Sequence, residues 1–375
     1  MRYALVGCGK VAEKHLKAAL DHRDRLEIVA LVDRDATAPG RLLDRCGIGR
    51  KERLGIRIFS DHREMLREAR PELVAITTPS GTHAAIGLDA VAAGAHVLVE
   101  KPLTLDLVEA DRLVVAARQA GVRIAVGHMY RFFPMVAMLR EDLVAGRFGR
   151  ILFGDVKVRW GHGQDYYDQA SWRGTWAADG GALMNQSVHA FDLMTWLMGH
   201  EPAPILDVTG TVSRMARNIQ AEDYGAAVLR FRSGADCLLE GTTLTDPHRK
   251  EASFFVQGTD GFVRAGLRKG IPHVEIRDGR GRSLVGKYLR RWLRESMRTR
   301  TGRLALRRLG NAHSGLYGDL LDAIRDGRDP RADGVSGRDA LELVLAIYRS
   351  ARTRLPVSLP LAEGSTREME GFFDA

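Results

Sequence analysis

Two basic side chains able to move a proton stand where the chain predicts buried structure. Lys101 lies in the stretch VEKPL, directly after a predicted strand, and His189 lies in GGALMNQSVHAFD, the predicted start of a buried helix. A lysine in a partly dry site can donate to a hydroxyl or release its proton, and histidine titrates near neutral pH. Positioned groups of this kind accelerate proton transfer by about 10²–10⁴. The structural alternatives are a lysine at a strand end and a core histidine with satisfied hydrogen bonds.

Asn185 precedes His189 by four residues. Four residues of an α-helix turn the chain by about 400°, which predicts that the two side chains share a face. Gly180 and Gly181, just before this helix, allow close backbone approach. Asn185 is neutral, so it can hydrogen-bond to a substrate but cannot stabilise an imidazolium as a carboxylate would. We therefore expect proton transfer to fall on His189 and Lys101 together, and the residues leave open which of them is the formal base.

A glycine-rich turn near the N-terminus predicts a dinucleotide site. GCGKVA follows a predicted strand and opens a predicted helix, the context in which GxGxxG/A binds a pyrophosphate. Gly7 permits the tight turn, Gly9 lets the backbone approach the phosphates, and Ala12 lets helix and strand pack closely. The start of the helix adds N–H groups and a positive dipole end. The predicted contacts are Gly7, Gly9, Lys10, Val11 and Ala12, and a glycine turn without a nucleotide is the alternative.

Asp33 ends the second predicted strand, at the distance from the glycine turn where an acid binds the adenosine ribose. A carboxylate there accepts from the ribose hydroxyls and repels a 2′-phosphate, which favours NAD. Arg34 follows immediately and could pair with that phosphate instead, so NADP stays open. The structural alternative for Asp33 is a turn residue at a strand end.

The elements that must position these residues show two different hydrophobic patterns along the chain. Apolar strands alternate with helices over the first part of the chain, which predicts a parallel sheet covered on both faces. Period-two alternation with turn residues then predicts an antiparallel sheet. The predicted strands are 2–7, 26–33, 72–79, 95–102, 122–128, 151–160, 205–215, 224–234, 235–244 and 252–266; the predicted helices are 10–22, 82–96, 106–120, 134–146, 182–198, 317–326 and 337–352.

Length and composition agree with two α/β domains. The chain has 375 residues, and the change of rhythm divides it into a nucleotide-binding domain, 1–125, and a substrate-binding and oligomerisation domain, 126–375. Its three cysteines form no CxxC pair, so neither a zinc site nor a disulfide framework is predicted, and we expect no metal. The first residues lack the apolar core of a signal peptide, and no stretch approaches the roughly 18 apolar residues that span a bilayer. We expect a cytoplasmic protein.

The net charge is +9, and much of the excess lies in the segment 280–308, which contains a single acid, Glu295. Tyr288, Leu289 and Trp292 stand among its arginines, as in a basic amphipathic helix. A solvated face, an oligomer interface and peripheral contact with an anionic membrane are the alternatives. The segment contains no base-reading motif, so we expect no nucleic-acid partner.

Several stretches, in this order, resemble the Gfo/Idh/MocA oxidoreductase family: GCGKVAEKH, TTPSGTHAAIGLDAVAAGAHVLVEKPL, GHMYRFFP, AGRFGRI, GGALMNQSVHAFDLMTWLMG and LPVSLPL. The resemblance covers nearly the whole chain. It implies a Rossmann domain with a doubly wound parallel sheet, followed by an α+β domain with a large, open, mostly antiparallel sheet. It also implies hydride transfer between NAD(P) and a hydroxyl carbon of a sugar or polyol, and assembly into a homo-oligomer, a dimer or a tetramer.

Carried over by position, the resemblance implies roles for single residues. Lys101 matches the lysine of the family's Glu-Lys-Pro motif and His189 its active-site histidine. The implied cofactor contacts further along the chain are Thr78, Pro79, Ser80, His83, Glu100 and Lys101, with Ser80 where the family often has asparagine. The implied substrate contacts are Lys101, Arg131, Trp172, Arg173, Asn185 and His189.

Asn185 departs from the aspartate that many members carry four residues before the histidine. The pattern MNQSVHAFDL is similar to a subgroup that includes dehydrogenases of UDP-N-acetylglucosaminuronate, acting at its 3-position. We therefore expect an NAD(P)-dependent dehydrogenase of a nucleotide-linked or otherwise anionic sugar. Dehydrogenation of a free sugar or inositol is one alternative. A sensor that binds NAD and sugar without turnover is another, because a fold does not dictate function.

Overall fold

The computed structural model describes residues 1–199, 204–298, 303 and 311–374. The chain divides into two compact units. The first comprises Met1–Thr104, Glu109–Phe132 and Glu295–Arg338, and the second comprises Leu105–Val108, Phe133–Arg294 and Asp339–Ala375. The described part of the chain contains no helix that is both long enough and apolar enough to cross a bilayer.

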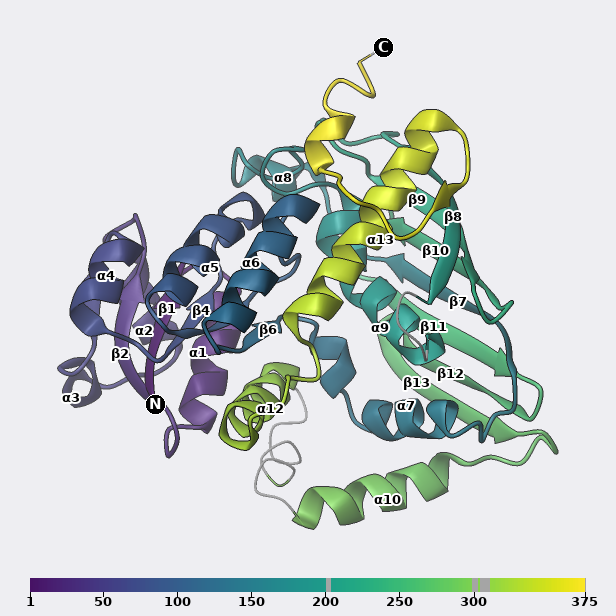
Figure 1. Ribbon diagram of the computed structural model, residues 1–375, viewed down its shortest axis with the longest axis horizontal. Helices are drawn as coiled ribbons and strands as arrows, with labels where there is room; N and C mark the ends of the chain where they lie inside the picture. The colour runs from purple at the N-terminus through teal and green to yellow at the C-terminus, as the bar shows by residue number, and fades with distance from the viewer. Residues whose placement is uncertain (200–203, 299–302, 304–310, 375) are drawn as a thin grey trace. The chain divides into compact units, whose positions relative to one another are not determined.

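The first unit is built on a six-stranded parallel sheet with the strand order β3-β2-β1-β4-β5-β6 (Figure 1). The strands are β1 (Arg2–Val6), β2 (Glu27–Val32), β3 (Arg57–Phe59), β4 (Leu73–Ile76), β5 (His96–Val99) and β6 (Ile124–Val126). The predicted doubly wound parallel sheet is confirmed. The periodicity missed β3, because three residues with two exposed side chains carry no apolar run.

Helices cover this sheet. They are α1 (Ala12–Asp21), α2 (Ala38–Arg45), α3 (Arg50–Arg53), α4 (His62–Ala69), α5 (His83–Ala92), α6 (Leu107–Gln119) and α12 (Ala312–Asp326), with short 3-10 turns at Ser80–Thr82 and Met129–Phe132. One core lies beneath α1, α2 and α12 and contains alternate strand residues such as Tyr3, Leu5 and Leu31. Residues that point to the same face of a strand recur every second position, so each strand supplies this core with every other side chain.

Helix α12 belongs to the first unit although it lies near the C-terminus. It packs against α1, and Leu316 and Leu320 are buried in the same core as Leu16 (Figure 1). The prediction of a single cut near residue 125 rests on the change of rhythm along the chain and stays a prediction. By contacts, 295–338 lie with the N-terminal residues, because burying the apolar face of α12 against α1 requires it.

The second unit contains an eight-stranded sheet with the order β13-β12-β11-β7-β10-β9-β8-β14. Its strands are β7 (Ile151–Arg159), β8 (Ile205–Ser213), β9 (Tyr224–Phe231), β10 (Asp236–Thr242), β11 (Glu251–Gly258), β12 (Gly261–Arg268), β13 (Ile271–Asp278) and β14 (Val357–Ser358). All neighbours are antiparallel except β7 and β10, which run parallel. The predicted large, mostly antiparallel sheet is confirmed, and β13 and β14 extend it beyond the predicted strands.

The helices of this unit are α7 (Val136–Val144), α8 (Gln164–Asp168), a π-helix at Ala182–Ser187, α9 (Val188–Met198), α10 (Val285–Arg298, whose last turn lies in the first unit) and α13 (Gly334–Thr353, which begins there). Helix α9 packs on β7 and β11 (Figure 1). Glycines in the sheet make this possible: a Cβ on Gly154 would overlap Met194, and one on Gly241 would overlap Ser187. The polar residues at the start of this helix are thereby held against a rigid sheet.

Candidate cofactor and substrate site

The predicted dinucleotide residues gather at one edge of the parallel sheet. The glycine turn follows β1, Asp33 follows β2, Thr78 follows β4 and Lys101 follows β5. These are the carboxyl ends of parallel strands, where open α/β sheets bind their ligands. The structure therefore brings these predicted residues to a common edge.

The turn at Gly7 tolerates no side chain. Its φ is +93°, and a Cβ would lie 2.8 Å from the backbone carbon of Thr77 and the backbone nitrogen of Thr78. The hydroxyl of Thr77 donates to the carbonyl of Gly7 at 2.5 Å. This hydrogen bond holds the turn against the end of β4. Our sequence reasoning missed Thr77; its signal is a hydroxyl residue directly after a strand that neighbours the glycine turn.

The beginning of α1 fits a pyrophosphate. The N-cap is Val11, and no described side chain caps its free N–H groups. Gly9 and Lys10 are exposed, and a Cβ on Gly9 would meet no described atom within 4 Å. Uncapped N–H groups at a helix start favour an anion, and the dipole adds to this preference.

Asp33 is partly exposed, and both its oxygens hold the local backbone. Its Oδ2 accepts from the N–H of Cys8 at 2.7 Å, inside the glycine turn, and its Oδ1 accepts from the N–H of Asp35 at 2.9 Å. Each carboxylate oxygen keeps a second lone pair for a ribose hydroxyl. Arg34 is exposed beside it. The carboxylate thus connects the pyrophosphate turn to the position predicted for the ribose.

His83 joins two loops of this edge. Its Nδ1 lies 2.8 Å from the carbonyl oxygen of Pro102, and its Nε2 lies 2.9 Å from that of Thr78. Burial lowers the pKa of this imidazole against the opposing pull of the two carbonyls. The ring therefore holds the loop Thr78–Pro79–Ser80 beside the Glu-Lys-Pro loop. Its predicted contact with the cofactor stays a prediction.

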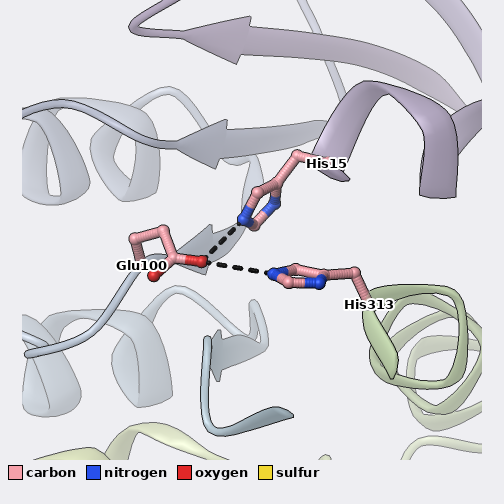
Figure 2. Close-up of side chains that lie close together, drawn as sticks. All are labelled: His15, Glu100 and His313. Carbon is pink, nitrogen blue, oxygen red and sulfur yellow. Dashed lines mark hydrogen bonds and ion pairs between the residues drawn. The ribbon is translucent and has the colours of Figure 1, made fainter. Parts of the chain in front are cut away.

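Lys101 and Glu100, at the end of β5, have different surroundings. Lys101 is half-buried, and its backbone N–H donates to its neighbour's Oε2 at 3.2 Å. Glu100 is buried, with His15 and His313 around its other oxygen (Figure 2). Burial alone would raise the pKa of the Glu100 carboxyl, but the hydrogen bonds from the two histidines outweigh it and hold that pKa well below its usual range. Glu100 is thus an ionised, interior group beside Lys101.

Arg131 lies in the short turn after β6. It is buried, and its guanidinium donates to the carbonyl of Arg331 at 2.7 Å. This bond holds the turn to the segment that follows α12. The predicted contact of Arg131 with substrate stays a prediction.

Asn185 and His189 belong to different kinds of helix. The prediction of one continuous α-helix over 182–198 is wrong at its start, because Ala182–Ser187 is π-helical and the α-helix begins at Val188. A π-turn takes more residues than an α-turn, so the two side chains are not related by a simple α-helical repeat. Single π-turns are frequent at functional sites.

A partly buried group of hydrogen bonds fixes the amide of Asn185. Its Nδ2 donates to Asp179, and the other oxygen of Asp179 accepts from the N–H of Gly174 at 2.8 Å. The side chain of Gln186 donates to the Asn185 oxygen at 3.0 Å. Asp179 supplies a carboxylate next to this amide, which the sequence did not reveal because it lies outside the predicted helix.

Beneath the π-helix lies Glu222, fully buried on the segment before β9. Its Oε1 accepts from the N–H of Leu183 at 2.8 Å and from the hydroxyl of Tyr348 at 2.9 Å. Burial raises the pKa of this carboxyl to about 8. Its Oε2 lies against Gly181 and has no hydrogen-bond partner in the described chain. We did not predict this residue, since a lone glutamate before a strand carries no signal.

Trp172 and Arg173 form a stacked group with Tyr166. The guanidinium carbon of Arg173 lies 4.1 Å from the centroid of the Tyr166 ring and 5.5 Å from that of Trp172. Its Nη1 donates to the Tyr166 carbonyl at 2.7 Å. Its Nε is buried and has no hydrogen-bond partner among the residues that the structure describes. A guanidinium held by stacking with an unused donor suits an anionic or carbonyl group.

The described part of the basic segment forms α10. Tyr288 is buried, and its hydroxyl donates to Asp142 at 2.5 Å, while Leu289, Leu293 and Met297 are exposed. The remainder of the predicted segment, 299–302 and 304–308, lies outside the described residues. Membrane contact by this segment stays a prediction.

A parallel sheet with a glycine turn, followed in the chain by a large mostly antiparallel sheet, fits a dinucleotide-binding protein with a second, α+β unit. The model of the Gfo/Idh/MocA oxidoreductase family's NAD-binding Rossmann fold matches residues 1–128, and that of its C-terminal alpha/beta domain matches residues 140–359. The chain belongs to the Gfo/Idh/MocA oxidoreductase family and is an NAD-dependent sugar oxidoreductase.

Among its relatives are two solved dehydrogenases, each in complex with NADH and UDP-GlcNAcA. The WlbA dehydrogenase of Bordetella pertussis is 32% identical, with a TM-score of 0.77 over 96% of this chain and 99% of that one. The WlbA dehydrogenase of Chromobacterium violaceum is 33% identical, with a TM-score of 0.78 over 96% of each chain. The scyllo-inositol 2-dehydrogenase (NAD(+)) of Bacillus subtilis is 26% identical over 98% of each chain. Relatives of this chain therefore act on or bind different polyols and sugars.

Proposed function

We propose that this protein oxidises a ring hydroxyl of a UDP-linked sugar acid of the UDP-GlcNAcA type, with NAD as the hydride acceptor. The observation that carries the proposal is the likeness, over 96% of the chain, to two dehydrogenases solved with NADH and UDP-GlcNAcA. The Asn-Gln pair at the start of the active-site helix supports the same choice of substrate class.

Lys101 and His189 carry the proton in this proposal. Bound NAD accepts the hydride, which is the chemistry of the cofactor itself. Lys101 donates a hydrogen bond to the oxygen of the reacting hydroxyl, and the proton that this hydroxyl loses passes to His189. Asn185 is held by Asp179, so its remaining hydrogen-bonding capacity has a fixed direction.

Arg173 is the group proposed to recognise the substrate's negative charge. Its guanidinium is preorganised by two aromatic rings, and its Nε has no hydrogen-bond partner in the described chain. A donor held in place before binding costs little entropy when the anion arrives. A fixed guanidinium charge pairs with an acid and gains no such ion pair from a neutral polyol, so the group favours an acid over inositol.

The test is turnover with purified protein and NAD. Absorbance at 340 nm would be followed with UDP-GlcNAcA, UDP-GlcNAc, a free sugar acid and scyllo-inositol, and products identified by mass spectrometry. Single-turnover measurements detect a cofactor that is reduced and reoxidised without leaving. We expect a keto product from UDP-GlcNAcA, with kcat/KM at least about tenfold above that for UDP-GlcNAc, since one charge-assisted contact contributes about 1.5–3 kcal/mol.

Other results would contradict the proposal in distinct ways. Preference for scyllo-inositol would assign the protein to the polyol branch of its family. Tight binding of NADH and UDP-GlcNAcA without any product, even in a single turnover, would make the protein a sensor.

A further inference from the structure

A chain of buried hydrogen bonds ends at Glu100. Tyr3 and Tyr317 join their hydroxyls at 2.8 Å, the Tyr317 hydroxyl lies 3.1 Å from Nδ1 of His15, and Nε2 of His15 lies 2.8 Å from Oε1 of Glu100. Nε2 of His313 lies 3.6 Å from the same oxygen (Figure 2). All five side chains are buried. Of these five residues, only Glu100 is among the cofactor contacts that the family resemblance implies.

A neutral and a protonated His15 orient the hydrogen bonds of this chain in opposite directions. A neutral His15 that donates from Nε2 to Glu100 must accept at Nδ1, so the Tyr317 hydroxyl donates to it and accepts from Tyr3. Burial raises the pKa of both tyrosines, so both hydroxyls keep their protons. Every donor then points toward one carboxylate, and each bond polarises the next.

Glu100 is held from several elements at once. His15 comes from α1, His313 and Tyr317 come from α12, and the carboxylate lies against the residue after β6, since a Cβ on Gly127 would lie 3.1 Å from Oε1. The other oxygen, Oε2, accepts from the N–H of Lys101 at 3.2 Å. The helix that begins at the dinucleotide turn is therefore connected to the backbone of the proposed catalytic lysine.

Two imidazoles and a carboxylate could also hold a metal ion, since their ligand atoms lie within 4.8 Å of one another. The distance of 2.8 Å between His15 and Glu100 is that of a direct hydrogen bond. A fully buried tetrahedral zinc site would need a fourth ligand, and this group supplies three. The hydrogen-bonded arrangement accounts for the contacts without an ion.

We propose that Glu100 is a positioning residue: in contact with His15 and His313, it fixes the backbone of Lys101 and keeps the Lys101 ammonium protonated in the resting enzyme. The charged and titratable groups around it are His15 and Lys14 on α1, His313 and Tyr317 on α12, His83 on α5, and Lys101 itself. The carboxylate lies 3.2 Å from the backbone nitrogen of Lys101, so its charge stands next to the residue that carries the ammonium. The proposal rests on the proposed function only for the role of Lys101 in turnover.

The first test removes the charge and keeps the shape. Glu100→Gln would be compared with Glu13→Gln, which removes a surface carboxylate from α1. The pKa of Lys101 would be measured by competitive labelling with acetic anhydride and peptide mass spectrometry, which needs no substrate. In E100Q the midpoint should fall by about one pH unit, because an ammonium that loses a nearby anion gives up its proton more easily. kcat should fall at least about tenfold, a fraction of the 10²–10⁴ of general acid–base catalysis.

The second test keeps Glu100 and removes a donor. His15→Phe takes away the closest hydrogen bond, which raises the pKa of the carboxyl, so its charge disappears at low pH and returns at high pH. The kcat of H15F should therefore recover as pH rises, whereas that of E100Q should not. His15→Gln keeps an N–H donor and should restore the wild-type profile. A loss due only to packing would be independent of pH and unrescued by glutamine.

The outcomes separate this proposal from the function on which it rests. If the pKa of Lys101 were the same in E100Q and E13Q, the proposed role of Glu100 would be overturned, whatever the activity of the two variants. Wild-type protein without turnover on any sugar would overturn the proposed function and leave the labelling result to decide the proposal. One equivalent of zinc retained by wild-type protein through gel filtration and absent from E100Q would overturn it in favour of a metal site.

Discussion

At the scale of single residues, two buried glutamates show how neighbours decide charge. Glu100 and Glu222 are both fully buried, and burial alone raises the pKa of either carboxyl. Glu100 faces two imidazoles, one hydrogen-bonded at 2.8 Å and one 3.6 Å away, and both favour the anion. Glu222 has one backbone N–H and one tyrosine hydroxyl on a single oxygen, and its pKa rises to about 8. The first is an anion at neutral pH and the second is mostly a neutral acid.

Glu222 should make stability depend on pH. Its pKa is about 8 in the folded chain against an ordinary value of 4.5, so its contribution is complete below pH 4.5 and is lost as pH rises toward 8. Glu222→Gln mimics the neutral acid and should flatten the dependence of Tm on pH between 5 and about 8.5. Glu27→Gln, at an exposed position on β2, is the control. Parallel profiles for wild type and E222Q would show that Glu222 is ionised in the folded protein.

The contributions of Lys101 and His189 to turnover should be separable from cofactor binding. Lys101→Met and His189→Ala should each lower kcat about 10²-fold or more, because each removes a group that moves or stabilises the proton. NADH binding, followed by its fluorescence, should stay within a few-fold of wild type. Lys17→Met and His248→Ala change exposed residues of the same types and should leave kcat unchanged. Near-normal turnover in both K101M and H189A would remove these residues from the mechanism.

At the scale of elements, the π-helix decides where the polar residues point. The helix starts directly after Gly180 and Gly181, and its first residues pack on Glu222 and the sheet. Hydrophobic periodicity predicts a helix over 182–198 but cannot distinguish an α-turn from a π-turn, because both bury the same apolar residues. The choice of a π-turn over an α-turn follows from the contacts of Leu183 and Ser187 with the sheet.

Gly181 should be intolerant of a side chain. A Cβ there would overlap both the carbonyl and the side chain of Glu222, so Gly181→Ala should lower the free energy of unfolding by about 1–3 kcal/mol or more, as overpacking does. Gly286→Ala places the same methyl on exposed α10, where a Cβ meets no described atom within 4 Å, and should be neutral or slightly stabilising. Thermal unfolding of both variants checks this. Equal Tm values would show that Glu222 moves aside at little cost.

At the scale of the whole molecule, cofactor binding should stabilise the chain by mass action. NADH at 100 times its Kd should raise the free energy of unfolding by about 2.7 kcal/mol. NADPH at the same concentration should raise Tm less, because the Asp33 carboxylate opposes a 2′-phosphate. Asp33→Ser should narrow the difference between the cofactors. A larger rise in Tm with NADPH than with NADH in the wild-type protein would instead indicate that Arg34 binds the 2′-phosphate and that the cofactor is NADP.

The sequence by itself determined the features that depend on local spacing. A parallel sheet and its nucleotide-binding edge are predicted by the strand–glycine turn–helix pattern at Gly7, by the acid at Asp33 and by the alternation of apolar runs. Each of these signals depends only on residues that are neighbours along the chain. Only the tertiary structure decided which residues share an interior. His15, Glu100 and His313 are far apart in sequence, and Glu222 contacts the π-helix from the segment before β9. Their protonation follows from burial and from partners brought by other elements, and neither can be read from residue type or spacing.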